Sequence, residues 1–496
     1  MTTPPPPPGD DDPPPPADDD PPPPADDDPP PPADDDPPPP ADDDPPPPGD
    51  DDPDGGDRPG LLRRVADRIR RAPGRTGLIA GFAAGAAVAA LVAVYVVPVL
   101  DRDPGLERGD LVILSGRDDG DGNQRQALVD QWNTLHPENP ARIEEIAADA
   151  DAQHSEMVAR AQAGGAGVDI FNLDVTWTAE FASSDYIRPL PDEQDVAGFL
   201  PAPLATCRYQ GKLWGLPFNT DAGLLYYRTK LVTTAPANWS QLVNTVQDVL
   251  ERPAATGPQP VAGWAGQLRD YEGLTVNALE AIWGAGGEVV DGHGEVVIDS
   301  PEAQTGLTRL ATGLRPGAPQ VILPDSVRFD ETATTQAFAG GKLVFMRNWP
   351  VAHRALDPAG GADSAAAVEF GVAKLPGPSV LGGQNLAVAK DSRHPRAARA
   401  LIGFLTGERS QQLLFERGGF AATREIVYRD AAVVKLYRYA PTLLDAIRSA
   451  HSRPVTAHYA QFSETFRQVV LEALGDGGRL PADAKPRLQR ALQGYK

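Results

Sequence analysis

One stretch between residues 211 and 232 places aromatic rings around a polar centre: GKLWGLPFNTDAGLLYYRTKLV. Asn219 and Asp221 supply an amide and a carboxylate, and Tyr226 follows a few residues later. Such a set suits a ligand with apolar C–H faces and a rim of hydroxyl groups, because rings cover the faces while amides and carboxylates bond the rim. The stretch therefore predicts a carbohydrate site. The alternative for its aromatic residues is ordinary core packing.

Further polar residues follow predicted strands. The apolar runs LVILSG (111–116) and VDIFNLD (168–174) each precede a helical pattern, which predicts an α/β sheet with parallel strands. In such sheets, ligands meet the loops at the carboxyl ends of the strands. We expect four residues near these ends to contact a ligand: Asp118, Asp121, Asp174 and Trp177. For Asp174, a helix N-cap is the alternative role.

Two more segments carry candidates. YEGLTVNALEAIW (271–283) predicts a helix on which Asn277 and Glu280 share one face, so they point either at a ligand, with Glu272 nearby, or at solvent. FMRNWP (345–350) follows a predicted strand, and its Arg347, Asn348 and Trp349 complete the expected site. We expect Trp349 to stack on a ring face, with core packing as the alternative. Arg347 forms either bidentate bonds to hydroxyl groups or a surface ion pair.

The body of the chain, about residues 110–496, resembles the extracellular solute-binding proteins of bacterial ABC sugar importers, the group similar to maltose- and trehalose-binding proteins. Five stretches carry the resemblance in the family's order: 168–190, 212–232, 266–291, 340–350 and 382–407. The resemblance implies an α/β, two-lobe periplasmic-binding-protein type II fold with a hinge between the lobes. It also implies a sugar held in the cleft, no cofactor, and the permease subunits of an ABC transporter as partners.

The resemblance also assigns roles to individual residues. It implies that Asn219 and Asp221 lie at the cleft floor, that Asp174 accepts sugar hydroxyl groups, and that Trp349 is a stacking face. Within GGQNLAV, similar trehalose-type proteins often carry an aromatic residue where this chain has Gln384. A hydrogen-bonding amide therefore replaces a stacking surface, and the sugar is not fixed by the resemblance.

The same resemblance divides the body into lobes. Lobe one is expected to comprise residues 110–220 with 381–430, and lobe two residues 222–378 with 431–496. The chain then crosses between them near residues 218–222 and 376–382, where GPSVLGG offers glycines that absorb backbone rotation. Apolar residues at helical spacing in 450–474 predict a helix on lobe two, preceded by RPVTAHY, which resembles a strap near the cleft.

The N-terminal region has a different composition. Residues 1–57 repeat the octapeptide DDDPPPPA, which predicts a disordered arm, with a ligand for a proline-reading module as the alternative. An arginine-rich segment (58–76) precedes an uncharged apolar stretch (77–100) long enough to be a transmembrane helix. The positive-inside rule then predicts a single-pass cell-membrane protein with a cytoplasmic N-terminus and an extracellular binding domain. A cleaved signal peptide is the weaker alternative.

The composition of the chain excludes some kinds of ligand and site. The formal net charge is −24, and most of it comes from the aspartates of the repeat. The chain beyond residue 76 is still acidic, so this body offers no electrostatic case for binding nucleic acid. Cys207 is the single cysteine, which excludes an intrachain disulfide and a cysteine-based zinc site. We expect a monomer without a metal.

The enzyme and signalling alternatives remain to be weighed. The sequence has no GxSxG elbow, no GxxxxGK[ST] phosphate loop and no HExxH motif, so we expect no enzyme. A glycoside hydrolase is a minor alternative, because its chemistry needs only two suitably spaced carboxylates. A sugar sensor that signals through the membrane is the other alternative, suggested by the predicted cytoplasmic arm.

Overall fold

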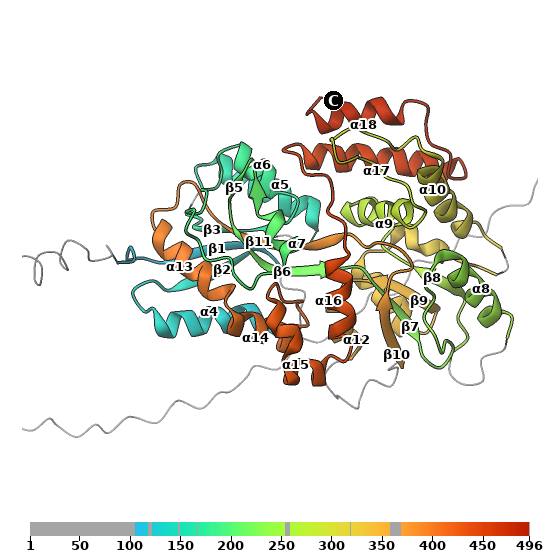
Figure 1. The fold of residues 1–496 in the computed structure, drawn as a ribbon, viewed down its shortest axis with the longest axis horizontal. Coiled ribbons are helices and arrows are strands. Elements are labelled where there is room, and N and C mark those ends of the chain that lie inside the picture. The colour runs from blue at the N-terminus through green and yellow to red at the C-terminus, as the bar shows by residue number, and fades with distance from the viewer. Residues whose placement is uncertain are drawn as a thin grey trace, which may run out of the picture. The chain divides into compact units, whose positions relative to one another are not determined.

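The computed structural model describes residues 105–117, 122–146, 149–165, 167–252, 258–317, 319–357 and 369–495 (Figure 1). The octapeptide repeat, the arginine-rich segment and the apolar stretch 77–100 lie outside these residues. In the described part of the chain, none of the helices has the length and apolar character needed to cross a bilayer.

The first sheet has five strands and forms from two distant segments of the chain. In spatial order they are β2 (Ala141–Ile146), β1 (Leu111–Gly116), β3 (Ile170–Asp174), β11 (Leu381–Val388) and β6 (Leu216–Ala222). The predicted strands at 111–116 and 168–174 are confirmed, and β1 is parallel to both β2 and β3. The predicted parallel arrangement of these strands is confirmed, and the sheet as a whole is mixed, because β11 runs antiparallel to β3 and to β6.

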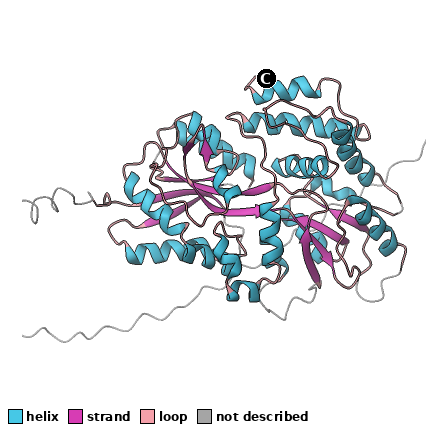
Figure 2. Ribbon diagram, in the orientation of Figure 1, coloured by secondary structure: helices cyan, strands magenta, loops and turns pink. Residues whose placement is uncertain are grey.

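Helices cover both faces of this sheet (Figures 1 and 2). They are α4 (Gln124–Leu135), α5 (Ala150–Gln162), α6 (Thr178–Ser183), α7 (Pro201–Thr206), α13 (Pro395–Leu405) and α14 (Glu408–Gly418). Buried residues of α4 and α13 pack with Leu111 and Ile113, whereas those of α5 and α6 pack with Leu114 and Phe171. The alternation of strand side chains thus builds a core on each face. A short hairpin, β4 (Arg208–Tyr209) and β5 (Lys212–Leu213), lies before β6.

The second sheet has four strands. In spatial order they are β10 (Phe370–Lys374), β7 (Leu224–Arg228), β9 (Leu343–Asn348) and β8 (Ala262–Ala265). Its helices are α8 (Trp239–Leu250), α9 (Glu272–Trp283), α10 (Pro301–Leu314), η2 (Pro324–Arg328), α11 (Glu331–Ala339), α12 (Val351–Leu356), α17 (Tyr459–Gly475) and α18 (Ala484–Leu492). The helix predicted within 450–474 is confirmed as α17, whose aromatic residues enter the core beside α9.

The chain passes from one sheet to the other at three places. Gly223 links β6 to β7, and residues 375–380 link β10 to β11. The third passage follows η3 (Glu425–Arg429), α15 (Ala431–Leu436) and α16 (Ala440–Arg448), which pack in a core shared with β6 and β7. Beyond α16, the segment 450–458, here called the strap, begins by pairing with the second passage, because His451 N donates to Ser379 O at 2.8 Å and Leu381 N to His451 O at 2.8 Å.

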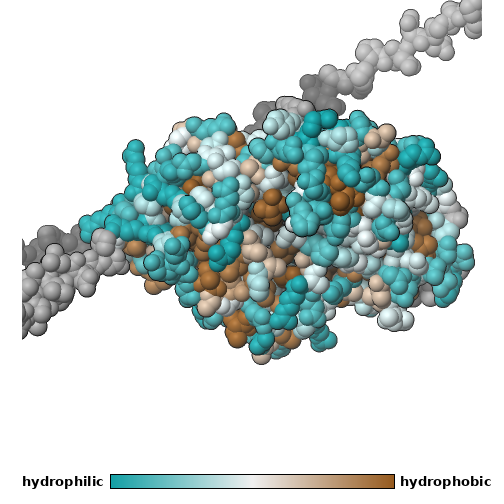
Figure 3. All heavy atoms as spheres, turned by 45° about the horizontal axis from the view of Figure 1, so that its top comes forward, coloured by the Kyte–Doolittle hydropathy of each residue, from teal (hydrophilic) through white to brown (hydrophobic). Residues whose placement is uncertain are grey.

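The outer surface is mostly polar. Figure 3 shows a face on which hydrophilic residues surround separate groups of hydrophobic ones. The exposed large apolar side chains of the described residues are scattered along the chain, among them Leu135, Val261, Ile426 and Val455. Single exposed apolar residues are normal in folded proteins, so they do not by themselves mark a binding surface.

Gly383 on β11 lies where the sheet leaves no room for a side chain, so substituting it tests the sheet geometry around the candidate site. Its φ is 122°, and a Cβ at this position would lie 2.3 Å from Asn219 O. We expect Gly383→Ala to lower the unfolding free energy by about 1 to 3 kcal/mol, because the strained backbone and the clash add. Gly403→Ala in α13, where a Cβ meets open space, should instead gain about 0.5 to 1 kcal/mol. Urea unfolding of both variants measures the difference, and equal stabilities would contradict this geometry.

Candidate ligand-binding site

Three predicted residues form a row across the first sheet. Asp174 on β3 lies opposite Gln384 on β11, and Gln384 lies opposite Asn219 on β6. Residues directly opposite each other in neighbouring strands project from the same face of a sheet, and so do residues two apart in one strand. Asp221 therefore joins the same face as Asn219. We call these four residues the polar row.

The polar row contains buried acceptors without partners. Asn219 is only 2% exposed, and its Nδ2 donates to Asp221 Oδ2 at 3.3 Å. Its Oδ1 and the Oε1 of Gln384 are both buried with no hydrogen-bond partner. Buried polar atoms are almost always hydrogen-bonded in folded proteins, because an unmade bond forfeits the solvation of the atom. The row is thus suited to receive donors from a ligand.

Asp174 makes both a local and a long-range contact. Its Oδ1 accepts from Thr176 N at 2.9 Å and from Thr176 Oγ1 at 2.6 Å. Its two carboxylate oxygens also accept from Arg453 Nη2 at 3.0 and 3.3 Å. The helix N-cap alternative for Asp174 is wrong, because the N-cap position of α6 is occupied by Trp177. Ligand contact by Asp174 stays a prediction, and its carboxylate is already held by Thr176 and Arg453.

Arg453, in the strap, was missed by sequence reasoning. It is buried, and its Nη1 donates to Glu272 Oε1 at 2.7 Å while Nη2 contacts Asp174. Glu272 also accepts from Tyr459 Oη at 2.5 Å and from Ser463 Oγ at 2.6 Å. Arg453 thus joins a residue of the first sheet to a helix of the second. Its partners lie 181 and 279 residues away, so only the resemblance of RPVTAHY to a strap hinted at its place.

Trp349 is held where β9 ends. Its backbone carbonyl accepts from Tyr226 Oη at 2.8 Å, and its backbone N–H donates to Asn348 Oδ1 at 2.8 Å. Its indole Nε1 donates to Glu331 Oε1 at 3.3 Å, and the guanidinium of Arg347 covers its ring at 3.8 Å. Tyr226 and Asn348 are fully buried, so the structure gives them the role of fixing Trp349.

Trp349 and Asp221 approach each other at Gly382. A Cβ on Gly382 would lie 3.2 Å from Asp221 Cβ and 3.3 Å from Trp349 Cζ3. Gly382 lies opposite Asp221 in the pairing of β11 with β6. The absence of a side chain at Gly382 therefore lets an aromatic ring from the second sheet lie beside the polar row of the first.

Arg347 and Glu280 form a buried pair. Arg347 Nε donates to Glu280 Oε2 at 2.9 Å and Nη2 donates to Oε1 at 2.7 Å, with both side chains less than a tenth exposed. Contact of Arg347 with ligand hydroxyl groups stays a prediction, whereas the alternative of a surface ion pair is wrong, because the pair is buried. The solvated face proposed for Asn277 and Glu280 is likewise wrong, since α9 is buried on nearly every side. Asn277 Nδ2 donates to Gly273 O at 2.8 Å.

The carboxyl group of Asp221 is electrostatically isolated. Burial, and after it the neighbouring charge of Asp174, raise its pKa to about 7. Arg347, Arg125 and the hydrogen bond from Asn219 act in the opposite direction without cancelling the effect. A carboxyl group in such surroundings gains from any ligand that brings a donor or a positive charge.

The raised pKa of Asp221 predicts a pH dependence of stability. Between about pH 4 and pH 7 the folded state holds a proton that the unfolded chain releases, so the contribution of Asp221 falls as the pH rises and is lost above about 7. Asp221→Asn cannot ionise. We expect its unfolding free energy, relative to wild type, to rise by up to about 1.4 kcal/mol per pH unit through this window and then level off. Denaturant unfolding from pH 4 to pH 8 measures it, and a constant difference would refute the isolation of Asp221.

Trp177, one of the predicted site residues, does not join the polar row. Asp118 and Asp121 lie outside the described residues. Trp177 is buried in the core beside Phe171, Phe181 and Met157, and its ring contacts His154 at 5.3 Å between centroids. Although Trp177 follows the end of a strand, its side chain packs against residues of α5 and α6.

Two further arginines, Arg269 and Arg467, connect the part built on the second sheet to α5 of the first. Arg269, before α9, pairs with Asp149 at the start of α5 at 3.0 Å. Arg467 on α17 pairs with Asp151 of α5 at 3.0 Å and with Asp270 at 3.0 Å. Together with Arg453 on Asp174, these contacts hold the second-sheet helices against the first sheet in this structure.

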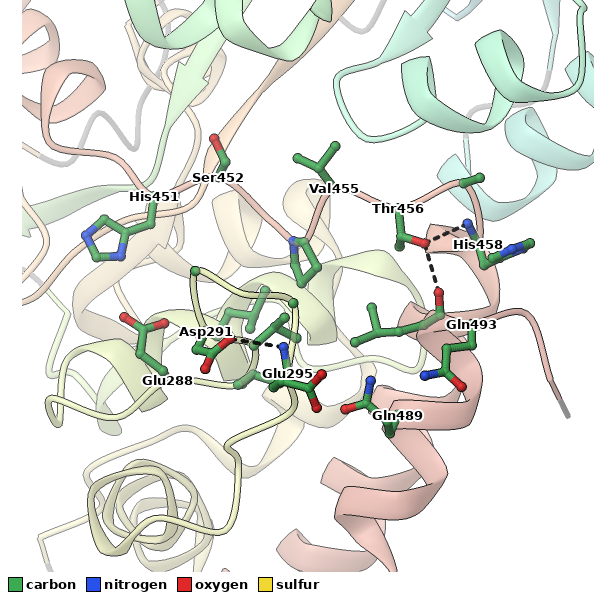
Figure 4. A pocket seen from close by; sticks show the side chains of 18 of the residues that line it. Glu288, Asp291, Glu295, His451, Ser452, Val455, Thr456, His458, Gln489 and Gln493 are labelled. Carbon is green, nitrogen blue, oxygen red and sulfur yellow. Dashed lines mark hydrogen bonds between the residues drawn. The ribbon is translucent and has the colours of Figure 1, made fainter. Parts of the chain in front are cut away.

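The larger of the two cavities described lies elsewhere. It has a volume of about 940 Å³ and is bordered by the strap, residues 288–295 and α18 (Figure 4). Glu288, Asp291 and Glu295 lie on one side of it, with Val455 and Thr456 of the strap on the other (Figure 4). None of the predicted site residues lines it. The second cavity is small, about 70 Å³, and its lining includes Asn277, Glu280 and Arg347.

The architecture defines the class of protein. A mixed five-stranded sheet and a second α/β part, joined by short crossings with polar and aromatic side chains beside them, form the α/β periplasmic-binding-protein fold. In the described residues, no group of three or more His, Cys, Asp or Glu side chains is placed to hold a metal ion.

The chain belongs to the bacterial extracellular solute-binding protein family, whose model matches residues 119–412. A probable ABC transporter-binding protein of Deinococcus radiodurans is 30% identical over 353 residues, which are 68% of this chain and 82% of that protein. The protein is therefore a solute-binding protein of an ABC transporter. The family is not enzymatic, so the hydrolase alternative is set aside.

Solved structures share the fold. Maltose-bound MalE3 of T. maritima has a TM-score of 0.68 at 29% identity, and the match covers 78% of this chain and 99% of that one. The GacH receptor of Streptomyces glaucescens, solved unliganded and with acarbose, has a TM-score of 0.65 at 22% identity and covers 79% of this chain and 100% of its own. At that identity the second likeness concerns the fold alone.

Proposed function

We propose that this solute-binding protein captures a sugar, a di- or oligosaccharide, between its two sheets and delivers it to the permease subunits of an ABC importer. The observation that carries the proposal is the meeting of the Trp349 ring with the polar row at Gly382. An aromatic face beside unpaired acceptors matches the apolar face and hydroxyl rim of a pyranose. The T. maritima protein, a relative at 29% identity, binds maltose in its solved structure, which adds support.

A ligand-dependent melting screen tests this proposal. The full-length protein is heated with a panel of mono-, di- and oligosaccharides, each at high millimolar concentration. A ligand that binds only the folded state stabilises it by about 2.7 kcal/mol at one hundred times its Kd, so the bound sugar should raise the Tm by several degrees. Amino acids and short peptides serve as controls. A panel in which only these controls shift the Tm would contradict a sugar ligand.

Trp349 and Asp174 should each contribute to sugar affinity. We expect Trp349→Ala to weaken binding by about 1 to 3 kcal/mol, because a stacking platform loses apolar burial and C–H contact. Asp174→Ala should cost a similar amount, since its loss removes the acceptor of the sugar donors and of Arg453 Nη2. Calorimetry measures both, with Asp192→Asn, an exposed carboxylate of the first-sheet part, as the control. Unchanged affinity in both variants would remove these residues from the site.

Closure about the passages near Gly223 and 375–380 is part of the proposal. It is supported by ion pairs that join α5 to Arg269 and Arg467, contacts that an entering ligand would break and re-form. Dyes placed on α8 and α13 should move together when sugar saturates the protein, as read by energy transfer. An unchanged transfer efficiency between sugar-free and saturated protein would argue against closure.

The membrane anchor at 77–100 and the extracellular position of the binding part are also proposed, on the length and flanking charges of that stretch. Protease added to intact cells should then remove the binding part while the N-terminal repeat stays protected. Deleting residues 1–57 distinguishes an importer from a sensor. Unchanged sugar uptake with an unchanged transcriptional response in that strain supports the importer. Intact uptake with a lost transcriptional response supports a sensor.

A further inference from the structure

The charges around the polar row do not balance. Five carboxylates and three guanidinium groups act around the meeting point of Trp349 and the row: Asp174, Asp221, Glu272, Glu280, Glu331, Arg125, Arg347 and Arg453. Arg125 Nη1 donates to Ser115 Oγ and to Gly116 O, both at 3.0 Å. Arg453 is shared by two of the carboxylates, and Arg347 is bound to a third. The nearby Arg269 has carboxylate partners of its own, Asp149 and Asp330.

Asp221 and Glu331 are the two acids without a cation. Glu331 accepts from neutral donors, Tyr271 Oη at 2.7 Å and Trp349 Nε1 at 3.3 Å. Asp221 accepts from Asn219 at 3.3 Å and forms no ion pair with any described residue. Because Asp221 shares its face of the sheet with the row, its negative charge is presented where a ligand would enter.

The unpaired groups beside Asp221 are acceptors as well. The Nδ2 of Asn219 is directed at the Asp221 carboxylate, which fixes the orientation of the amide and leaves Oδ1 as its free atom. Gln384, opposite Asn219, adds a second buried acceptor in Oε1. A hydroxyl group brings one donor, whereas an ammonium group brings three donors and a positive charge. The row therefore matches an ammonium group better than a hydroxyl group.

We propose that the sugar bound at this site is an amino sugar, whose protonated amine is held by Asp221, Asn219 and Gln384 while its ring lies on Trp349. The inference rests on the proposed function, since it names the substrate class of the same site. Burial, which raises the pKa of Asp221, makes a charged donor beside its carboxylate more favourable than a neutral one.

Matched sugar pairs test the inference. Calorimetry on the full-length protein compares glucosamine with glucose and trehalosamine with trehalose, in which one amine replaces one hydroxyl group. At pH 7.5, we expect an amino member to bind about tenfold to a hundredfold more tightly than its partner, the size of a charge-assisted hydrogen bond with a desolvated carboxylate. Asp221→Asn should remove most of this preference, read as the ratio of the two affinities in the same variant. Asp192→Asn, exposed on the same part, should change neither.

The outcomes separate the two proposals. If a neutral sugar binds as tightly as its amino partner, or more tightly, the amino-sugar inference fails while the sugar-binding function stands. If the amino preference survives in Asp221→Asn, the assignment of the amine to Asp221 fails. If neither these pairs nor the wider sugar panel bind, both proposals fail. Circular dichroism and the Tm of each variant show whether a loss of binding reflects a loss of fold.

Discussion

Replacing Glu280 with alanine is expected to lower the unfolding free energy by about 3 to 5 kcal/mol. The guanidinium of Arg347 is 1% exposed and donates twice to this carboxylate, so its charge would be left buried without a counter-ion. Val380 N, which donates to Glu280 Oε1 at 3.0 Å, would lose its acceptor as well. Urea unfolding measures the loss, and a decrease below about 1 kcal/mol would show that Arg347 finds solvent or another partner.

The double variant Glu280→Leu with Arg347→Met is the matched control for the single one. Removing both charges leaves no buried ion, so it should recover most of the stability that Glu280→Ala loses. Recovery would show that the cost of the single change is an uncompensated charge. A double variant as unstable as the single one would instead indicate that shape and packing at Gly223 dominate, since the pair lies against that first passage.

Deleting residues 450–496 is expected to unfold the part built on the second sheet. The deletion removes eight buried residues from its core: Tyr459, Phe462, Phe466, Val469, Val470, Ala473, Ala484 and Leu488. At about 1.5 to 3 kcal/mol for each large apolar side chain, the loss reaches on the order of 10 kcal/mol, similar to the whole stability of a typical domain. Far-ultraviolet circular dichroism on heating should lose its cooperative transition for this part.

Deletion of residues 1–57 is the control for that truncation. Residues 1–57 consist mainly of proline and aspartate and offer little apolar surface to bury. We therefore expect the protein without them to keep the wild-type Tm. A C-terminally truncated protein that stays soluble and melts cooperatively at the wild-type temperature would contradict the role of α17 and α18 in the core.

Much of the architecture could be predicted because it depends on local patterns. The strand at 111–116, the strand ending at Asp174 and the helix α17 follow from apolar periodicity within one segment. The antiparallel direction of β11 could not be predicted in this way. Its place between β3 and β6 depends on pairing with strands about 165 to 215 residues earlier in the chain, which no local pattern encodes.

The site could also be predicted only in part, because contacts between distant segments cannot be read from one segment alone. Asp174, Asn219, Asp221, Trp349 and Gln384 were selected by residue type and by resemblance, and the structure brings them together. Arg347 and Glu280 were selected as ligand contacts, but their charges are opposite and their strands and helices adjacent, so they satisfy each other. Arg453 was missed because a cation is informative only once its acidic neighbours are known.

The most direct test of the account is the crystal structure of the protein with the sugar identified by the screen, read for where the sugar density lies. The account predicts a sugar ring packed on Trp349, with polar groups of the ligand bonded to Asp221, Asn219 or Asp174. A sugar found instead in the cavity of about 940 Å³ between the strap and α18, with the polar row unchanged, would contradict it.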